Sequence, residues 1–315
     1  MRRQVYHIYD TILKLIMLIY ESEFLKYIGV DKKIKEILKT EIILLNGNTK
    51  ILDYLCQFDD GTLGNIEFQF PVAYSEDLKR FFDYNVLSEL TFESETNTIV
   101  VNFTDCNSGD KELKIGDSKD FHPKIFYLGD IDFEKELENI QIKLGLFQLE
   151  RIINKDIANI QLTYEEEISL LLMSLPPKYE DKSPFLKQTV GILKNEKLIH
   201  DENINGFKSV IKLEIEKFLT LKQQEKLKGD VNVSTETEDL LRQVINDVNR
   251  KYELEAFDEG YTKGKEQGYT KGKEQGYNLG KQENNEYIAL KMKGKYSPEE
   301  ISNITGLNIE SIEKL

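Results

Sequence analysis

The sequence is poor in the residues that build disulfide frameworks and zinc sites. Among its 315 residues are two cysteines, Cys56 and Cys106, and three histidines, His7, His122 and His200. The two cysteines make no disulfide framework and show no metal-site spacing. The histidines are scattered along the chain. These absences argue against a disulfide-stabilised fold and against a zinc enzyme.

Long apolar runs are absent as well. The longest one near the start, Leu15 to Tyr20, is far too short to span a bilayer. Asp10 and Lys14 interrupt the hydrophobic region that a signal peptide would need, and no small-residue cleavage site follows them. We therefore expect a soluble, cytoplasmic protein that does not act at a membrane.

Apolar residues and acidic charge are plentiful. Hydrophobic residues make up 40% of the chain and aromatic residues 10%, which is globular rather than disordered composition. The net charge of −14 argues against nucleic-acid binding by bulk attraction. The charge is uneven, because residues 263–295 carry +4 and residues 1–262 carry −15. This asymmetry is either an organisational feature or a by-product of a composition rich in Lys, Glu, Ile and Asn.

The first 130 residues mix helical and strand patterns. Hydrophobic periodicity and turn signals predict elements at residues 5–28 (amphipathic helix), 34–45, 50–58 and 62–70 (strands), 75–90 (helix), 97–103 and 124–128 (strands). The order of helix, three-strand meander, helix and strand predicts a compact α/β core over residues 1–130.

Residues 131–250 are mostly helical in pattern and contain no catalytic cluster. Apolar residues recur at helical spacing over residues 134–144, 164–175, 184–198, 206–221 and 236–249. We expect this segment to be a helical domain with a structural or interaction role.

An internal repeat occupies residues 251–295. Glycines recur at every fourth position from Gly260 to Gly280, and one octad occurs twice in succession, at 260–267 and 268–275. Six interior glycines would cost a lone helix about 6 kcal/mol relative to alanine, and a four-residue step makes them spiral around the helix. We therefore predict either a flexible spacer, which the glycine content favours, or a helix along which a second copy packs as a homo-oligomer.

The last twenty residues have the outline of a helix-turn-helix. Ser297 and Glu300 form a capping box with Pro298 at the first helical position, and Asn308 caps a second short helix after the turn at Gly306. Residues 296–315 carry a charge of −3, which suits DNA poorly. A small interaction or oligomerisation unit is therefore at least as well supported as a DNA-binding one.

Two carboxylates are predicted to face each other across a hairpin. If Asp59-Asp60-Gly61 forms a three-residue loop with its glycine left-handed, Phe58 pairs with Thr62 and Asp53 lies opposite Glu67. Cross-strand neighbours lie about 5 Å apart. A register slip of one residue would send Asp53 to the other face of the sheet.

Such a pair of acids is suited to a metal ion. Carboxylates this close repel each other unless a cation lies between them, and Gln69 adds an amide on the face of Glu67. Oxygen ligands of this kind suit Mg²⁺ or Mn²⁺, which can activate water against a phosphodiester. The alternative is an exposed hairpin with solvated acids. Against it, Ile66, Phe68 and Phe70 form an apolar opposite face.

The order of motifs resembles a known nuclease family. Asp53, followed after a hairpin by Glu67-Phe68-Gln69, resembles the PD-(D/E)XK superfamily, specifically the Rpn family of recombination-promoting nucleases and putative transposases, in which E-x-Q replaces E-x-K. Asp10 with Lys14 is similar to the family's D-x-x-x-K segment, and Arg80 with Tyr84 to its R-x-x-x-Y signature. The repeat and residues 289–307 look like its C-terminus. The resemblance covers roughly residues 1–104 and 257–315.

The resemblance implies a restriction-endonuclease-like core that cleaves DNA with Mg²⁺ or Mn²⁺. It implies that Asp53 and Glu67 coordinate the metal, with the backbone carbonyl of Phe68 as a further ligand. Gln69 occupies the position of the lysine that orients water in related nucleases. The resemblance further assigns Asp10 as the acid of the first helix and Arg80 and Lys14 as contacts to the scissile phosphate.

Two positions depart from the superfamily pattern. Leu52 stands where proline is expected, at a position that supplies no ligand. Gln69 brings no positive charge to the transition state, although Arg80 could compensate. The expected function is a metal-dependent DNA endonuclease associated with recombination or transposition. The alternative is a catalytically weak or inactive nuclease-fold protein that acts in DNA binding or oligomeric assembly, and a regulator built on the C-terminal helix pair is a weaker option.

Overall fold

The chain forms two compact units, Met1–Tyr252 and Glu253–Leu315. The computed structural model describes residues 2–44, 49–70, 72–107, 109–115, 119–153, 161–227, 231 and 235–315. In this part of the chain, no helix has both the length and the apolar character needed to cross a membrane.

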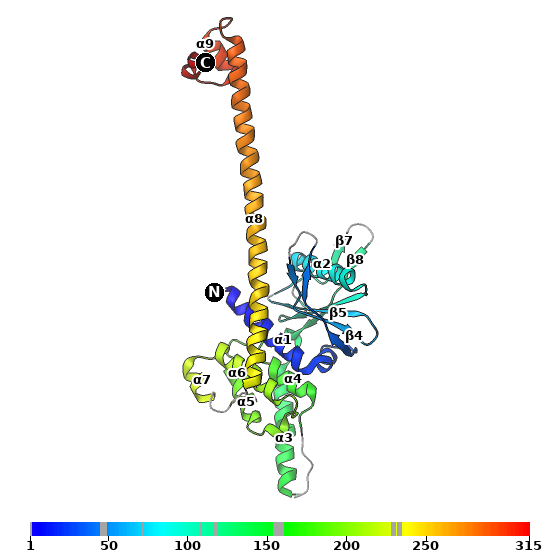
Figure 1. Ribbon diagram of the computed structural model, residues 1–315. Coiled ribbons are helices and arrows are strands. Elements are labelled where there is room, and N and C mark those ends of the chain that lie inside the picture. Colours follow the sequence, from blue (N-terminus) through cyan, green and yellow to red (C-terminus); the bar gives the residue numbers. More distant parts are fainter. Residues whose placement is uncertain are drawn as a thin grey trace. The chain divides into compact units, whose positions relative to one another are not determined.

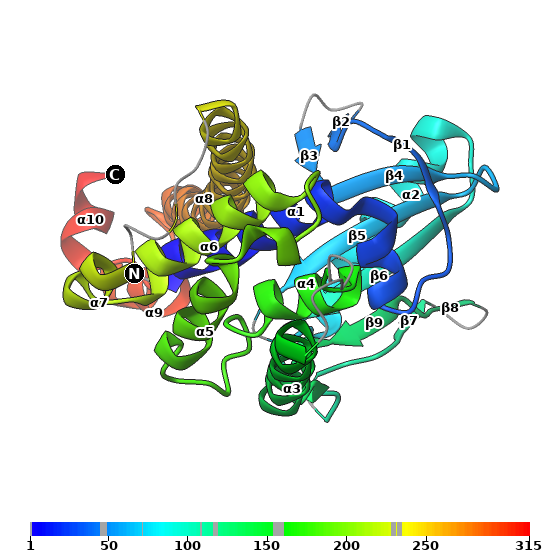
Figure 2. The same ribbon diagram turned by 90° about the horizontal axis from the view of Figure 1, so that it is seen from below.

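A five-stranded mixed sheet is the centre of the first unit (Figure 1). Its strand order is β1-β4-β5-β6-β9, and these strands are labelled in Figure 2. The strands of this sheet are β1 (Ile34–Ile37), β4 (Tyr54–Phe58), β5 (Leu63–Gln69), β6 (Thr96–Asn102) and β9 (Lys124–Tyr127). Strands β1, β4 and β5 pair antiparallel, whereas β6 runs parallel to β5 and β9 parallel to β6. The predicted mixed α/β class and antiparallel meander are confirmed.

Two predicted strands are broken in the structure. The run at 34–45 divides into β1 and β2 (Glu41–Ile43), and the run at 50–58 divides into β3 (Thr49–Ile51) and β4. Strands β2 and β3 pair with each other outside the main sheet, as do β7 (Leu113–Ile115) and β8 (Lys119–Phe121). The break between β3 and β4 leaves Asp53 outside a strand, at a bend before β4.

The main sheet is covered on both faces. Helix α2 (Ser75–Phe92) buries Leu78 and Phe81 against Val100 of β6. On the opposite face, Ile66 and Phe68 of β5 belong to the large hydrophobic core that contains the first helix. Side chains alternate along a strand, so β5 divides its residues between these two layers.

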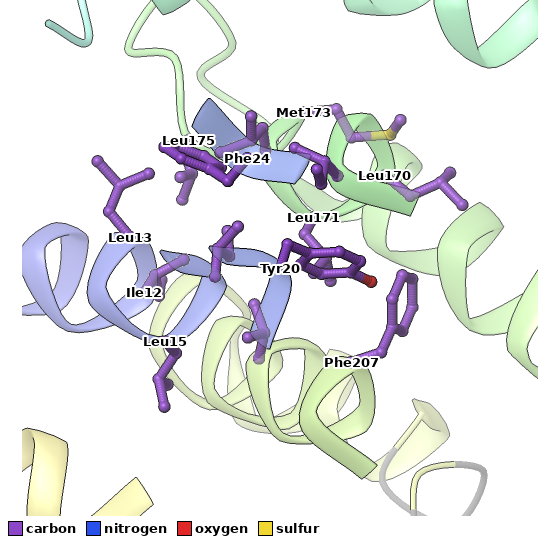
Figure 3. Packing of buried hydrophobic residues seen from close by; sticks show 14 of the residues in the cluster. Ile12, Leu13, Leu15, Tyr20, Phe24, Leu170, Leu171, Met173, Leu175 and Phe207 are labelled. Carbon is purple, nitrogen blue, oxygen red and sulfur yellow. The ribbon is translucent and has the colours of Figure 1, made fainter. Parts of the chain in front are cut away.

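The first helix, α1 (Arg2–Tyr27), is buried nearly all round rather than along one stripe. The predicted amphipathic face at Ile12, Leu15 and Ile16 is buried, and so are Leu13 and Met17 on other sides of the helix. Figures 2 and 3 show helices α4 (Tyr164–Leu172) and α6 (Ile204–Phe218) closing around α1. A helix that is apolar on every side belongs in a core, which is its place here.

The helical segment after residue 130 completes the first unit. It contains α3 (Phe133–Ile153), α4, α5 (Ser183–Leu193), α6 and α7 (Leu221–Leu227), with a short 3₁₀ turn at Glu196–Leu198 and another, Leu128–Asp130, directly before it. Its buried side chains share one hydrophobic core with α1 and β5. The boundary predicted near residue 130 therefore lies inside a continuous core, because the sheet and the helical layer both need α1 to cover their apolar faces.

Of the two conformations predicted for the glycine repeat, the structure has the helical one, because helix α8 (Thr235–Met292) runs through all six glycines. In the second unit, Ala289 of α8 is buried with Ile301 of α9 (Pro298–Thr305) and Ile312 of α10 (Ile309–Lys314). Val244 and Val248, in the part of α8 that belongs to the first unit, are buried in its core. With both ends held by packing, the intervening turns need only propagate, and propagation is much less costly than nucleation.

The predicted helix pair at the C-terminus is confirmed. Ser297 accepts a hydrogen bond from the Glu300 amide at 3.3 Å, and the Glu300 carboxylate accepts one from the Ser297 amide at 2.8 Å. Gly306 takes the left-handed conformation with φ of 71°, and the Asn308 side chain accepts from the Ser311 amide at 2.7 Å. These local signals succeeded because each acts within three or four residues of its partner.

One carboxyl, that of Glu214 in α6, lies fully buried in the helical layer. Burial raises the pKa of Glu214 well above its usual value, although Ser174 and the charge of Lys182 act in the opposite direction. A carboxyl whose folded pKa is raised binds its proton more tightly in the native state than in the unfolded chain. Its contribution to stability therefore declines as the pH rises above about 4.5, the value for the free side chain.

We expect Glu214→Gln to remove this decline. The difference in melting temperature between the variant and the parent protein, followed by circular dichroism, should grow in favour of the variant between pH 5 and pH 7.5. Glu216→Gln, at an exposed position of the same helix, is the matched control for the substitution itself. If the parent protein instead gains stability relative to Glu214→Gln as the pH rises, Glu214 is ionised and paired with Lys182.

Candidate active site

The predicted register of the acidic hairpin is confirmed. The Phe58 amide donates to the Thr62 carbonyl at 2.8 Å, the Gly61 amide donates to the Phe58 carbonyl at 3.0 Å, and Gly61 has φ of 85°. Tyr54 pairs with Ile66 as the last rung between β4 and β5. One step beyond this rung, Asp53 lies opposite Glu67.

Asp53 is buried, with only 4% of its surface exposed, and both of its carboxylate oxygens are used. Oδ2 accepts a hydrogen bond from the Phe68 amide at 2.9 Å, and Oδ1 accepts one from Nζ of Lys251. Burial by itself would raise the pKa of Asp53, but the charge and hydrogen bond of Lys251 and the Phe68 amide hold it below the usual value. Asp53 is therefore the ionised member of the acid pair.

Glu67 differs sharply from its neighbour. Its side chain is completely buried, and no donor in the described part of the chain reaches either carboxylate oxygen. Burial first, and then the negative charge of Asp53, raise the pKa of Glu67 well above its usual value. A carboxyl that is buried against a second acid, with no other group reaching its oxygens in the described residues, is costly to the fold and needs an explanation beyond packing.

The backbone of Phe68 lies beside the same pair. Its amide is bound to Asp53 in place of a strand partner, because β4 does not extend past Tyr54. In a strand, the N–H and C=O of one residue point toward the same neighbour. The Phe68 carbonyl therefore faces the Asp53 side of β5, where the resemblance expects it, while the Phe68 ring packs in the core on the α1 side.

Gln69 and Arg80 contact each other two residues further along. Nη2 of Arg80 donates to Oε1 of Gln69 at 3.0 Å and lies 3.6 Å from Oδ1 of Asp77. Nε2 of Gln69 donates to the Val72 carbonyl at 3.4 Å. Gln69 is thus held at both ends of its amide, and it presents the Arg80 guanidinium beside the acid pair. The Arg80 side chain is 36% exposed, so solvent and ligands can reach it.

The two candidates on α1 contact residues of helix α8. Oδ2 of Asp10 accepts a hydrogen bond from the Tyr252 hydroxyl at 2.6 Å, and Nζ of Lys14 lies 3.9 Å from Oδ2 of Asp247. Burial lowers the pKa of Lys14, and the charges of Asp247, Asp53 and Asp10 oppose this shift. The fold therefore brings Lys14 within electrostatic range of Asp53.

Sequence reasoning missed Lys251, which lies 198 residues from Asp53 along the chain. Nothing in its surroundings marks it out, since it is one of many lysines in a helical segment. The only available signal was indirect, namely that an amide at position 69 leaves the acid pair without the positive charge that superfamily members place there. The lysine and its acid partner are both buried, with 8% and 4% of their side-chain surfaces exposed.

A groove of about 450 Å³ lies near these residues, between α1, the β1–β2 segment and the start of α8. Lys14, Lys39 and Arg250 are the cationic residues in its lining, and Tyr54 connects it to the end of β4. Glu41 and Asp247 line it as well, so its charge is mixed.

The donors around the acid pair are oxygens, the kind of ligand that a magnesium-type ion takes. Magnesium is commonly held by one or two carboxylates together with water, and Asp53, Glu67 and the Phe68 carbonyl supply oxygens only. The burial of the Glu67 carboxyl against Asp53, with no donor from the other described residues, is the observation that a cation would explain. In the described residues, no group of three or more histidine, cysteine, aspartate or glutamate side chains could hold a metal.

Changes at the two acids should have different effects on stability. Asp53→Asn removes the carboxylate that faces the buried Lys251 ammonium, so we expect a loss of about 3 kcal/mol in the free energy of unfolding. Glu67→Gln replaces a carboxyl that burial and Asp53 keep from ionising by an amide that can still donate to Asp53, so stability should hold or rise. Urea unfolding in the presence of EDTA measures both values. Equal losses in the two variants would contradict the described pairing.

Neither a family model, a curated protein nor a solved structure matches this chain. The chemistry of the acid pair is therefore inferred from its own contacts and from the motifs that the sequence shows.

Proposed function

We propose that this protein is a metal-dependent endonuclease that hydrolyses DNA phosphodiester bonds, of the recombination- or transposition-associated type that its motifs resemble. The observation that carries the proposal is the buried pair of Asp53 and Glu67, in which Glu67 has no donor from the described residues. Two buried acids in this arrangement are suited to binding a cation. For stability alone, an apolar pair of similar size would cost less free energy to bury.

The order of elements supports this proposal. Helix α1, the antiparallel strands β1, β4 and β5, helix α2 and the parallel strand β6 follow in the sequence that a restriction-endonuclease-like core requires. Asp53 precedes the second of these antiparallel strands and Glu67 lies in the third. Both acids and Arg80 lie on this series of elements, and their positions in it support the proposed assignment.

In the proposed site, Asp53, Glu67 and the Phe68 carbonyl would hold Mg²⁺ or Mn²⁺. When bound, the ion supplies a more acidic water and stabilises the charge that develops on the phosphate. Arg80 contributes a fork of donors that can bind two phosphate oxygens, and its contact with Gln69 fixes the position of that fork. Lys14, with Lys39 and Arg250 in the lining of the neighbouring groove, would contact the DNA backbone, and Asp10 would serve as the acid of the first helix.

The test is nicking of supercoiled plasmid by the full chain with Mg²⁺ or Mn²⁺. We expect cleavage that requires the metal and that falls at least 100-fold in Asp53→Asn and in Glu67→Gln, because each variant removes charge from the ligand set. Asp59→Asn is the matched control, since Asp59 lies in the same hairpin but is exposed. It should cleave like the parent protein.

Cleavage of equal rate in all four proteins would point to a contaminant and contradict the proposal. No cleavage by any of them, with the melting temperatures intact, would favour the alternative of a nuclease-fold protein that acts in DNA binding or assembly. A DNA-binding measurement on the same samples would then distinguish those two roles.

A further inference from the structure

Lys251 is placed where the acid pair lacks a positive charge. Its Nζ donates to Oδ1 of Asp53, and both side chains are almost completely buried. The charge of Lys251 also acts on Glu67, so the ammonium lies within range of both acids. Gln69, at the position where the superfamily keeps a lysine, is an amide held by Arg80 and Val72.

The helical segment that carries Lys251 contacts other elements of the first unit through three consecutive residues. Nη2 of Arg250 lies 3.0 Å from Oε1 of Glu41, Lys251 bonds Asp53, and the Tyr252 hydroxyl donates to Asp10 at 2.6 Å. The Tyr252 ring also stacks on His7 with their centroids 3.7 Å apart. These contacts reach a strand, the acid pair and helix α1, and they fix the rotation of the helix so that Lys251 points at Asp53.

A buried ion pair is a poor way to gain stability. The desolvation of the two charges offsets most of their attraction, and well-packed apolar residues often do as well or better. The pair also uses the acid that the proposed ligand set requires. This combination of high cost and position at the reacting centre indicates a chemical role for the ammonium.

We propose that Lys251 supplies the catalytic positive charge that Gln69 cannot, as the ammonium that donates to the phosphate during cleavage. This inference rests on the proposed nuclease function and names one further residue of the same site. In the reaction, the oxygen of water forms a bond to phosphorus and the bond to the leaving oxygen breaks. Water gives up its proton to solvent, and the leaving oxygen takes one from solvent. Lys251 stays protonated and stabilises the charge on the non-bridging oxygens.

The main test compares Lys251→Met with Lys208→Met in the plasmid assay. Methionine keeps most of the length of lysine without its charge, and Lys208 is a partly buried lysine in an ion pair with Glu196 at 2.6 Å, far from the acids in sequence. We expect Lys251→Met to lose at least 100-fold in cleavage rate, as for removal of one oxyanion donor, and Lys208→Met to cleave like the parent protein.

A second readout follows Mn²⁺ binding to the full chain by electron paramagnetic resonance. Lys251→Met should bind Mn²⁺ as tightly as the parent protein or more tightly, because an ammonium no longer occupies Oδ1 of Asp53. Binding weakened tenfold or more would show that Lys251 only holds the acids in place, and would overturn the proposal.

Chemical rescue gives a third criterion. Lys251→Ala leaves space for a small primary amine, so added ethylammonium should restore part of the cleavage, whereas tetramethylammonium, which has no N–H donor, should not. Wild-type rates in Lys251→Met would reject the inference while leaving the nuclease function intact, and faster cleavage would show that the ion pair inhibits the site. If the parent protein fails to cleave at all, the proposed function fails and this role for Lys251 fails with it.

Discussion

The burial of helix α1 on every side is the constraint on which the first unit depends. A helix with Leu13 and Met17 buried as fully as Ile12 and Ile16 cannot be satisfied by one sheet face. The sheet covers one side, and α4 and α6 must return from far along the chain to cover the other. This requirement joins residues on both sides of position 130 into one core, and it also leaves the start of α8 against α1, where Tyr252 reaches Asp10.

The parts of the fold that the sequence could predict are those governed by neighbours. The loop before Thr62 needs a left-handed glycine at Gly61, and this requirement alone fixes the register that sets Asp53 opposite Glu67. The caps at Ser297 and Asn308 are equally local. The amphipathic interpretation of α1 was incomplete because it counted one apolar face, whereas the residues between those positions are apolar and buried as well.

The parts that could not be predicted depend on contacts between distant segments. Helix propensity includes the cost of each glycine in the repeat. It does not include the packing of Val248, before the repeat, and of Ala289, after it, which stabilises α8. In the same way, the pattern around Glu67 identifies the acids but not the lysine that faces them. The contact between Lys251 and Asp53 can be identified only from the folded structure, because no periodicity in the sequence links these two positions.

The charges at the candidate site explain why such a distant lysine is compatible with a metal. As described, Asp53 balances Lys251, while Glu67 has no donor from the described residues, so the acid pair has capacity for further positive charge. If a divalent ion were bound by both acids, Lys251 would lose its counter-charge. The anionic oxygens of a phosphodiester would then replace it, because they accept from an ammonium and from a guanidinium such as that of Arg80. Under the proposed function, the metal and the DNA backbone would therefore favour each other's binding, which would offset the repulsion between DNA and an acidic protein.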